Sequence, residues 1–422
     1  MSHEENHHPE LKSDYQCLMR MEEAWIWYGP PDPVTLQDIK NTGARSISTA
    51  LYEIPAGEVW TRQAILERKA LIESAGFTWS VVESIPVHEV IKVGEPEDLC
   101  EMYVQNYKES LRNLGRAGLD LLSFSFSPLF DWLRTDTEYP WHDGSLALSF
   151  NMDQFRVFDI HVLKRPGASA DYTPQGVKKA ATDFSHMGPD QVDKLTRTII
   201  AGLHGQKGYS LDNFRSELAK WKGVTKEKLF RNLTNFVSQL IEVAEEENIY
   251  LSLHPDDPPM SLLGLPNVAS TAADFERLFT SLPSPRNGMT FCMGSLASHW
   301  ENDVLMMARQ FSRRVRFVHL RNVVKTEDGG LVESGHLEGD ADLVSVMEVL
   351  LTEKEERNSR GESGVLSRLP MRSDHGHLML SDVGQQGIIP GHSVIGRLRG
   401  LAEIRGVMAA LGKGSFKLQH RT

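Results

Sequence analysis

Four polar side chains in the second half of the sequence are of the types that bind transition metals in proteins. They are His254 in IYLSLHPDDPP, Cys292 in MTFCMGS, His319 in VRFVHLRN and Asp374 in MRSDHGH. Each stands at the end of a short, mostly apolar run, which is the pattern of a buried strand. Two imidazoles, a thiolate and a carboxylate suit Zn²⁺, Fe²⁺, Mn²⁺ or Co²⁺ better than Ca²⁺ or Mg²⁺. The set predicts a site for a divalent transition metal.

Each of these residues also has a plainer structural interpretation when taken singly. A histidine at a strand end is often hydrogen-bonded for structure alone, and a cysteine in an apolar run is often a small core residue. Asp374 could cap a turn before His375. No C-x-x-C or H-E-x-x-H spacing enforces a local site. The metal interpretation therefore depends on the elements that carry the four residues.

Those elements are short β-branched or aromatic runs that alternate with amphipathic helical patterns from Met21 onward. Such alternation predicts parallel strands joined by right-handed crossovers. Eight strand candidates favour an α/β fold, a closed (β/α)₈ TIM barrel, whose active sites lie at the carboxyl ends of the strands. An open doubly wound sheet is the alternative, but no G-x-G-x-x-G follows the first strand. The strands are expected at Ala24–Tyr28, Ser46–Leu51, Thr78–Ser84, Leu119–Phe126, Ile249–His254, Met289–Met293, Val315–Leu320 and Leu369–Asp374.

One long stretch after the fourth strand interrupts this alternation. Residues 127–227 contain several prolines and helical patterns near Gln175–Phe184 and Gln191–Ala201. An unstructured loop of that length is improbable in a compact domain, so we expect a helical insertion capping the barrel mouth. Residues 1–20 are expected to be a disordered extension, and 21–422 a single barrel domain. The charged stretch Glu353–Ser367 is expected to be an exposed loop.

Composition limits the classes of function. With 45 Lys plus Arg and 57 Asp plus Glu, the formal charge is −12, which argues against a nucleic-acid partner. No apolar run approaches the ~20 residues of a membrane helix, so no membrane partner is expected. Three cysteines cannot form a disulfide framework and indicate a reducing, cytoplasmic setting.

Several longer strings resemble a known family along nearly the whole chain from Met21. They include MEEAWIWYGPPDPV, IPAGEVW, WSVVESIPVHE, DWLRTD, FDIHVLKRPGA, HPDDPP, GLP, HLR, DHGH and IGRLRGLAEIRG. Their order and length resemble the mannonate dehydratase family. The resemblance implies a (β/α)₈ barrel that holds a divalent metal, most often Mn²⁺, with Fe²⁺ or Zn²⁺ as alternatives. It further implies conversion of a small-molecule sugar acid, D-mannonate, to 2-keto-3-deoxy-D-gluconate in hexuronate catabolism.

The resemblance also assigns residues. His254, Cys292, His319 and Asp374 stand where the family has its metal ligands, and His375 stands where it has a catalytic histidine. The chain departs from the family at three places. His392 in PGHSVIGR replaces a tyrosine regarded as an acid/base, Ser373 replaces a proline, and Ser125 replaces a substrate-facing asparagine. We expect His375 and His392 to share proton transfer and Ser125 to contact substrate.

Further substrate contacts are expected from charged residues near the strand ends. Arg321 and Arg372 are candidates for binding a carboxylate, although a salt bridge on the barrel rim is an equal alternative. Asp257 could bind sugar hydroxyls, orient an imidazole, or satisfy backbone donors in a Pro-flanked turn.

Two other functions fit the same residues. One is a metal-dependent epimerase or aldose–ketose isomerase, or a dehydratase of another sugar acid, and the other is a silent paralogue that binds sugar acids. A homodimer is an open option for the assembly.

Overall fold

Eight parallel strands close into a barrel in the order β1-β12-β9-β8-β7-β4-β3-β2. The computed structural model describes residues 20–200 and 210–419, with side chains of the last helix only to Gly412. Each barrel strand lies within two residues of a predicted one, so the predicted (β/α)₈ TIM barrel is confirmed. Nearly all of the expected extension at 1–20 falls outside the described residues. The barrel strands are β1 (Glu22–Ile26), β2 (Ser46–Thr49), β3 (Thr78–Glu83), β4 (Leu121–Phe124), β7 (Tyr250–Leu253), β8 (Asn287–Cys292), β9 (Val315–His319) and β12 (Pro370–Arg372).

Helices surround the barrel, and many begin at a threonine. The side chains of Thr35, Thr61, Thr225 and Thr271 each accept a backbone N–H of the first helical turn, which satisfies an otherwise unpaired donor. These caps explain where the chain turns from loop to helix. The helices outside the insertion are α2 (Leu36–Thr42), α3 (Arg62–Ser74), α4 (Glu89–Val93), α5 (Glu97–Arg116), α10 (Lys226–Glu246), α11 (Ala272–Ser281), α12 (Met293–Ala297), α13 (Val304–Phe311), α14 (Leu343–Ser359), α15 (Val365–Arg368) and α16 (Val394–Gln419).

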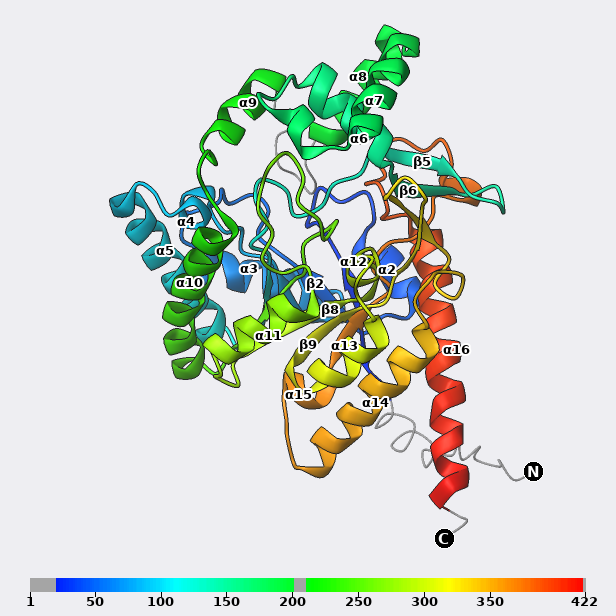
Figure 1. The fold of residues 1–422 in the computed structure, drawn as a ribbon. Helices are drawn as coiled ribbons and strands as arrows, with labels where there is room; N and C mark the ends of the chain where they lie inside the picture. The colour runs from blue at the N-terminus through cyan, green and yellow to red at the C-terminus, as the bar shows by residue number, and fades with distance from the viewer. Residues whose placement is uncertain (1–19, 201–209, 420–422) are drawn as a thin grey trace, which may run out of the picture.

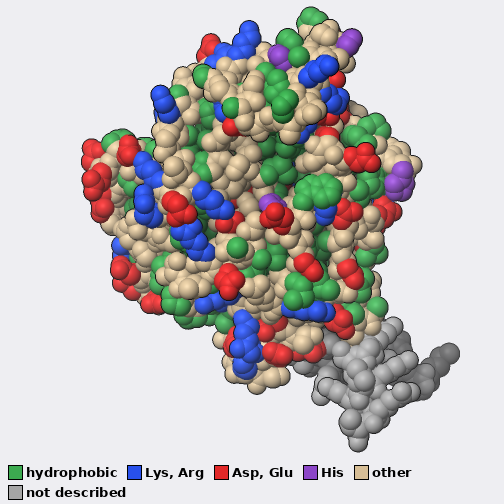
Figure 2. Space-filling model, in the orientation of Figure 1, with side chains coloured by type: hydrophobic (Ala, Val, Ile, Leu, Met, Phe, Trp, Pro, Cys, Tyr) green, Lys and Arg blue, Asp and Glu red, His purple; other side chains and the backbone are tan. Residues whose placement is uncertain are grey.

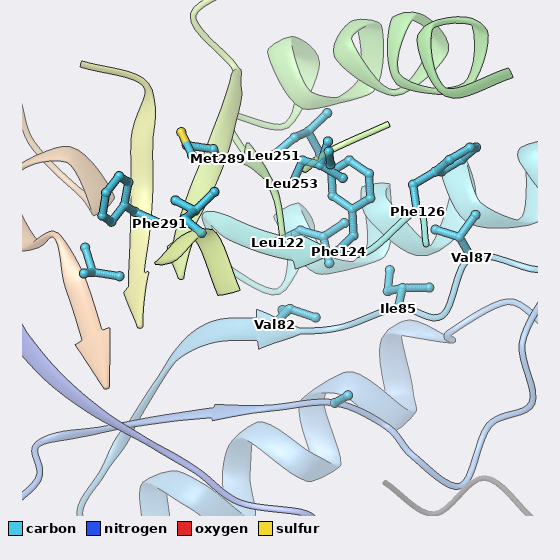
Figure 3. Close-up of a cluster of buried hydrophobic side chains, with 14 of the residues drawn as sticks. Val82, Ile85, Val87, Leu122, Phe124, Phe126, Leu251, Leu253, Met289 and Phe291 are labelled. Atoms are coloured by element: carbon cyan, nitrogen blue, oxygen red, sulfur yellow. The ribbon is translucent and has the colours of Figure 1, made fainter. Parts of the chain in front are cut away.

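The outward faces of the strands form the main hydrophobic core against the helices. Figure 3 shows this cluster, with Leu122 and Phe124 of β4 beside Leu251 and Leu253 of β7. Phe236 of α10 packs on it, with its ring centroid 6.3 Å from that of Phe124. Successive side chains of a strand point to opposite faces. Because these residues pack outward against the helices, the residues next to them in sequence point into the barrel.

The inward faces carry polar residues toward the upper end of the barrel. Thr290 Oγ1 lies 2.8 Å from Ser123 Oγ and 2.9 Å from Ser252 Oγ. Two residues further along the same strands stand Cys292 and His254, on the same inward side. Strand alternation therefore aims the predicted metal ligands at the barrel axis, above this layer of hydroxyl groups.

Residues 127–227 contain strands as well as the expected helices. Helices α6 (Met152–Val157), α7 (Pro174–His186), α8 (Pro189–Ile200) and α9 (Leu211–Ala219) lie at one end of the barrel, at the top of Figure 1. Two strands in this segment, β5 (Asp136–Pro140) and β6 (Leu146–Phe150), were not predicted. They join β10 (Asn322–Lys325) and β11 (Leu331–Ser334) in an antiparallel sheet of order β10-β11-β6-β5. A π-helical turn (Phe158–Val162) and 3₁₀ turns (Ala168–Asp171, Ser312–Arg314, Leu380–Asp382) complete the described elements.

The expectation of an exposed loop at Glu353–Ser367 was wrong at both ends, because α14 occupies residues 353–359 and α15 occupies residues 365–367. Helix α14 continues to Ser359, and Glu353 and Arg357 are buried within it. Glu353 Oε1 accepts from Arg357 Nε at 3.0 Å one helical turn away. This pairing allows two charged residues to be buried on the inner face of the helix.

The surface is mixed in charge on the face shown in Figure 2, where Lys and Arg side chains are interspersed with Asp and Glu. Among the described helices, none is both long and apolar enough to cross a membrane.

Candidate metal centre and active site

Three of the four predicted ligands meet at the carboxyl ends of adjacent strands. His254 follows β7, Cys292 ends β8 and His319 ends β9, and one ligand atom from each lies within 4.8 Å of the others. The closest approach is 3.3 Å, between His254 Nε2 and His319 Nδ1. Cys292 is directly opposite His319 in the β8–β9 register, which explains why two residues far apart in sequence end at the same level.

Asp374, the fourth predicted ligand, follows β12 and lies beside two of these three residues. Its Oδ2 lies 3.6 Å from Cys292 Sγ, and its Oδ1 lies 3.8 Å from His319 Nδ1. Its backbone has a φ of 66°, a left-handed conformation that aspartate tolerates better than most residues. Burial alone would raise the pKa of this carboxyl, but Arg372, His375, His319 and Arg321 hold the pKa well below its usual range. Asp374 is therefore an ionised carboxylate.

The four side chains fit a divalent transition metal. Two imidazole nitrogens, one sulfur and one carboxylate oxygen form the mixed donor set that such ions prefer, and all lie at or just after the ends of barrel strands. Ser295 Oγ lies 3.0 Å from Cys292 Sγ and can donate a hydrogen bond to the sulfur. His254 Nδ1 lies 2.7 Å from the Pro255 carbonyl, an acceptor that leaves Nε2 as the available lone pair.

Two buried arginines flank the cluster, where sequence analysis expected substrate contacts. Arg321 donates from Nε to Asp374 at 2.7 Å and from Nη1 to Glu333 at 3.1 Å, and its Nη2 pairs with Asp257. Arg372 donates from Nη2 to Glu83 at 2.7 Å and also pairs with Asp374. All three guanidinium nitrogens of Arg321 are thus engaged by protein groups, an arrangement that favours an orienting role for this residue.

Glu333, on the unpredicted strand β11, is the centre of a second buried network. Its carboxylate accepts from Arg134 Nη2 at 2.6 Å and faces His375 Nδ1 at 2.9 Å, in addition to the bond from Arg321. Because a carboxylate only accepts, it fixes the proton of a neutral His375 on Nδ1. The other ring nitrogen, Nε2, lies 3.9 Å from Asp374 Oδ1, beside the metal cluster.

His392 lies next to His375, with ring centroids 5.2 Å apart. Two glycines let the segments that carry the two histidines approach closely. Gly376 N donates to Gly391 O at 2.8 Å, which joins the two segments. A Cβ on Gly376 would lie 2.3 Å from the Arg397 backbone nitrogen, so only glycine fits there. His392 Nδ1 lies 3.0 Å from the Pro390 carbonyl, and its Nε2 lies 2.8 Å from the hydroxyl of Tyr28. Burial, and secondarily Tyr52, raise the pKa of Tyr28 well above its usual value, so its phenol is protonated and can donate to His392.

A cavity of about 1380 Å³ opens above these groups. Its wall includes six of the predicted site residues: Ser125, His254, Asp257, Arg372, Asp374 and His375. Among the described residues, Cys292, His319, Arg321 and His392 are not part of that wall and lie behind it, each at most 2% exposed. Ser125 Oγ makes a weak bond of 3.3 Å to Ser127 Oγ.

Several residues at the site were missed by sequence analysis. Glu83 and Tyr28 end or follow barrel strands as the ligands do, so their position was a usable signal. Trp132, in DWLRTD, lines the cavity with its ring 5.9 Å from that of His375, and the Arg134 guanidinium lies 4.8 Å from the indole. Glu333 gave no comparable signal, because its strand belongs to a sheet that the sequence did not predict.

The fold and the site define a (β/α)₈-barrel enzyme. Its strand ends bring candidate metal ligands together with a buried imidazole–carboxylate pair and a buried imidazole–phenol pair. The chain belongs to the D-mannonate dehydratase (UxuA) family, whose model matches residues 21–418. This finding confirms the resemblance seen in the sequence motifs and the prediction of a hydro-lyase family.

Two relatives and one solved structure illustrate the match. The chain is 44% identical over 393 residues to a mannonate dehydratase of Chromohalobacter salexigens, a span of 93% of this chain and 99% of the relative. The chain is also 42% identical to a mannonate dehydratase of Marinomonas sp., over 393 residues that again span 93% of this chain and 99% of the relative. The crystal structure of mannonate dehydratase from Streptococcus suis serotype 2 matches with a TM-score of 0.70 and 31% identity, over 94% of this chain and 95% of that one.

Proposed function

We propose that this chain dehydrates D-mannonate to 2-keto-3-deoxy-D-gluconate with the help of a divalent metal, Mn²⁺ being the first choice. The observation that carries the proposal is the convergence of His254, Cys292, His319 and Asp374 beside an oriented His375, in a member of this family. A metal held by these four residues would supply Lewis acidity and would help to orient the substrate.

The protein's own groups account for the proton transfers. Dehydration removes the C2 proton, expels the C3 hydroxyl as water and leaves an enol that becomes the 2-keto product, so it needs one base and one acid. We assign these two roles to His375 and His392, in either order. Glu333 holds the His375 ring with Nε2 beside Asp374, and the Tyr28 hydroxyl can donate a hydrogen bond to His392 Nε2. An imidazole ordinarily titrates near neutrality, which suits a group that must accept or donate a proton during the reaction.

Cationic and polar groups on the cavity wall suit an anionic sugar. Arg372 lies on this wall, is 7% exposed, and brings positive charge toward an anionic substrate in a protein of net charge −12. Because its three guanidinium nitrogens already contact His319, Asp374 and Glu83, this attraction is one of charge. Asp257 and Ser125 are candidates for hydroxyl contacts at the same wall. A cytoplasmic setting and a homodimer remain predictions that accompany this proposal.

The test is an assay of the metal-reconstituted protein against a panel of hexonates, with products identified by mass spectrometry and NMR. We expect D-mannonate to lose one water and yield the 2-keto-3-deoxy acid. A product of unchanged mass would mean epimerisation or isomerisation instead. Metal uptake without turnover of any hexonate would mean a silent sugar-acid-binding protein, and either result would refute the proposal.

A further inference from the structure

Glu83, the last residue of β3, is a buried carboxylate that directly faces one of the candidate metal ligands. Its Oε1 lies 3.2 Å from His319 Nε2 and 2.7 Å from Arg372 Nη2. The side chain is 13% exposed and forms part of the cavity wall. Its other oxygen, Oε2, is buried with no hydrogen-bond partner among the described residues.

The two ring nitrogens of His319 face different surroundings. Nδ1 lies on the side of the donor cluster, 3.3 Å from His254 Nε2 and 3.8 Å from Asp374 Oδ1. Nε2 lies on the opposite side, near Glu83. A nitrogen that binds a metal must offer its lone pair, so the proton of neutral His319 has to be on Nε2.

Glu83 and Arg372 favour opposite tautomers of His319. Arg372 Nε lies 3.1 Å from His319 Nε2 and, as a donor, stabilises an unprotonated Nε2. That tautomer would place the proton on Nδ1, where it would block metal ligation. Glu83 is an acceptor and stabilises a protonated Nε2, the form in which Nδ1 is available. Among the described neighbours of Nε2, the carboxylate is the one that selects the ligating tautomer.

We propose that Glu83 is a positioning residue of the metal centre: it accepts the Nε2–H of His319 and thereby keeps Nδ1 available as a ligand. Its ion pair with Arg372 Nη2, at 2.7 Å, holds the carboxylate beside the imidazole. The inference rests on the proposed function, because it assumes that His319 binds a metal. Loss of the Glu83 carboxylate should therefore weaken the affinity for the metal.

The experiment measures Mn²⁺ affinity by calorimetric titration of chelator-treated protein, together with thermal stability. Wild type is compared with Glu83→Ala and with the milder Glu83→Gln, whose amide oxygen can still accept a hydrogen bond. The matched control is Glu23→Ala, which removes a 5% exposed carboxylate from β1 whose partner is Arg405 Nε at 2.9 Å. Both Ala variants lose a buried carboxylate–arginine pair from a barrel strand, but only Glu83 faces His319.

We expect Glu83→Ala to raise the Kd for Mn²⁺ by about 10–100-fold, the usual cost of losing a hydrogen-bond partner of a ligating histidine. Glu83→Gln should fall between Glu83→Ala and wild type, and Glu23→Ala should bind Mn²⁺ as wild type does while losing thermal stability. Should Glu83→Ala fail to fold, Glu83→Gln alone decides. An unchanged Kd in the folded Glu83 variant overturns the role of Glu83 only, whereas wild type that binds no Mn²⁺ overturns the proposed metal site as well.

Discussion

Replacing Glu333 by glutamine tests the network that orients His375. Glu333 is 3% exposed, and its carboxylate faces Arg134, Arg321 and His375 at distances of 2.6, 3.1 and 2.9 Å. Removing one partner from a buried ion pair costs about 3–5 kcal/mol. Because Asp257 still accepts from both arginines, we expect the lower end, about 3 kcal/mol of unfolding free energy at pH 7.

The same substitution should change the acid sensitivity of the protein. Burial raises the pKa of Glu333, but His375, Arg321 and Arg134 outweigh it and hold the pKa below its usual range. A carboxyl with a lowered pKa in the folded state stabilises the protein above its unfolded pKa, about 4.3, and loses that contribution as the pH falls. The stability gap between wild type and Glu333→Gln should therefore be full at pH 7 and shrink below about pH 4.5.

The assay combines urea unfolding at pH 7 and pH 4 with steady-state kinetics. The glutamine amide is neutral and can turn either its oxygen or its NH₂ group toward His375 Nδ1, so it holds the ring less strictly than the carboxylate does. A misplaced catalytic group costs about 10²-fold in rate. The control is Glu227→Gln, which removes a carboxylate on the protein surface from an ion pair with Arg277 and should leave stability and rate unchanged. A Glu333→Gln enzyme with wild-type kcat and stability would refute the orienting role of Glu333.

Three further outcomes follow from the same contacts. His375→Ala should lower kcat by roughly 10²–10⁴ while metal content stays intact, as measured by elemental analysis beside initial rates. His392→Ala should behave alike, and full activity in either variant would remove that histidine from the mechanism. Phe236→Ala, in the core between α10 and β4, should cost about 3–5 kcal/mol in urea unfolding and leave the rate per folded molecule unchanged; a smaller cost would mean that the core closes around the gap.

The barrel and the four candidate ligands could be predicted because the relevant signals are local. Leu251, Ser252, Leu253 and His254 alternate between the two faces of a strand, and the carboxyl ends of parallel strands meet at one rim. The four residues His254, Cys292, His319 and Asp374 each end a strand or follow one within two residues, and this position was enough to expect them near one another. Glu83 and Tyr28 obey the same rule and could have been found with it.

The orienting residues could not be predicted, because they depend on pairings between distant segments. Glu333 reaches His375 only because β11 pairs with β6, in the register that joins Leu331 to Phe150. On the other side of β6 lies β5, DTEYP, which is short and polar and lacks the alternation that marks a buried strand. Arg321 was expected near a substrate carboxylate, and only the distances reveal that protein carboxylates already engage its donors.

The most direct measurement is activity on D-mannonate as a function of metal bound per chain. Chelator-treated wild type should be inactive, and its activity should rise in proportion to bound Mn²⁺ until one ion is held per chain. Cys292→Ala, which removes the sulfur donor 3.6 Å from Asp374, should bind the ion weakly and stay near the inactive level. Full activity of metal-free wild type, or of Cys292→Ala without bound metal, would contradict the account.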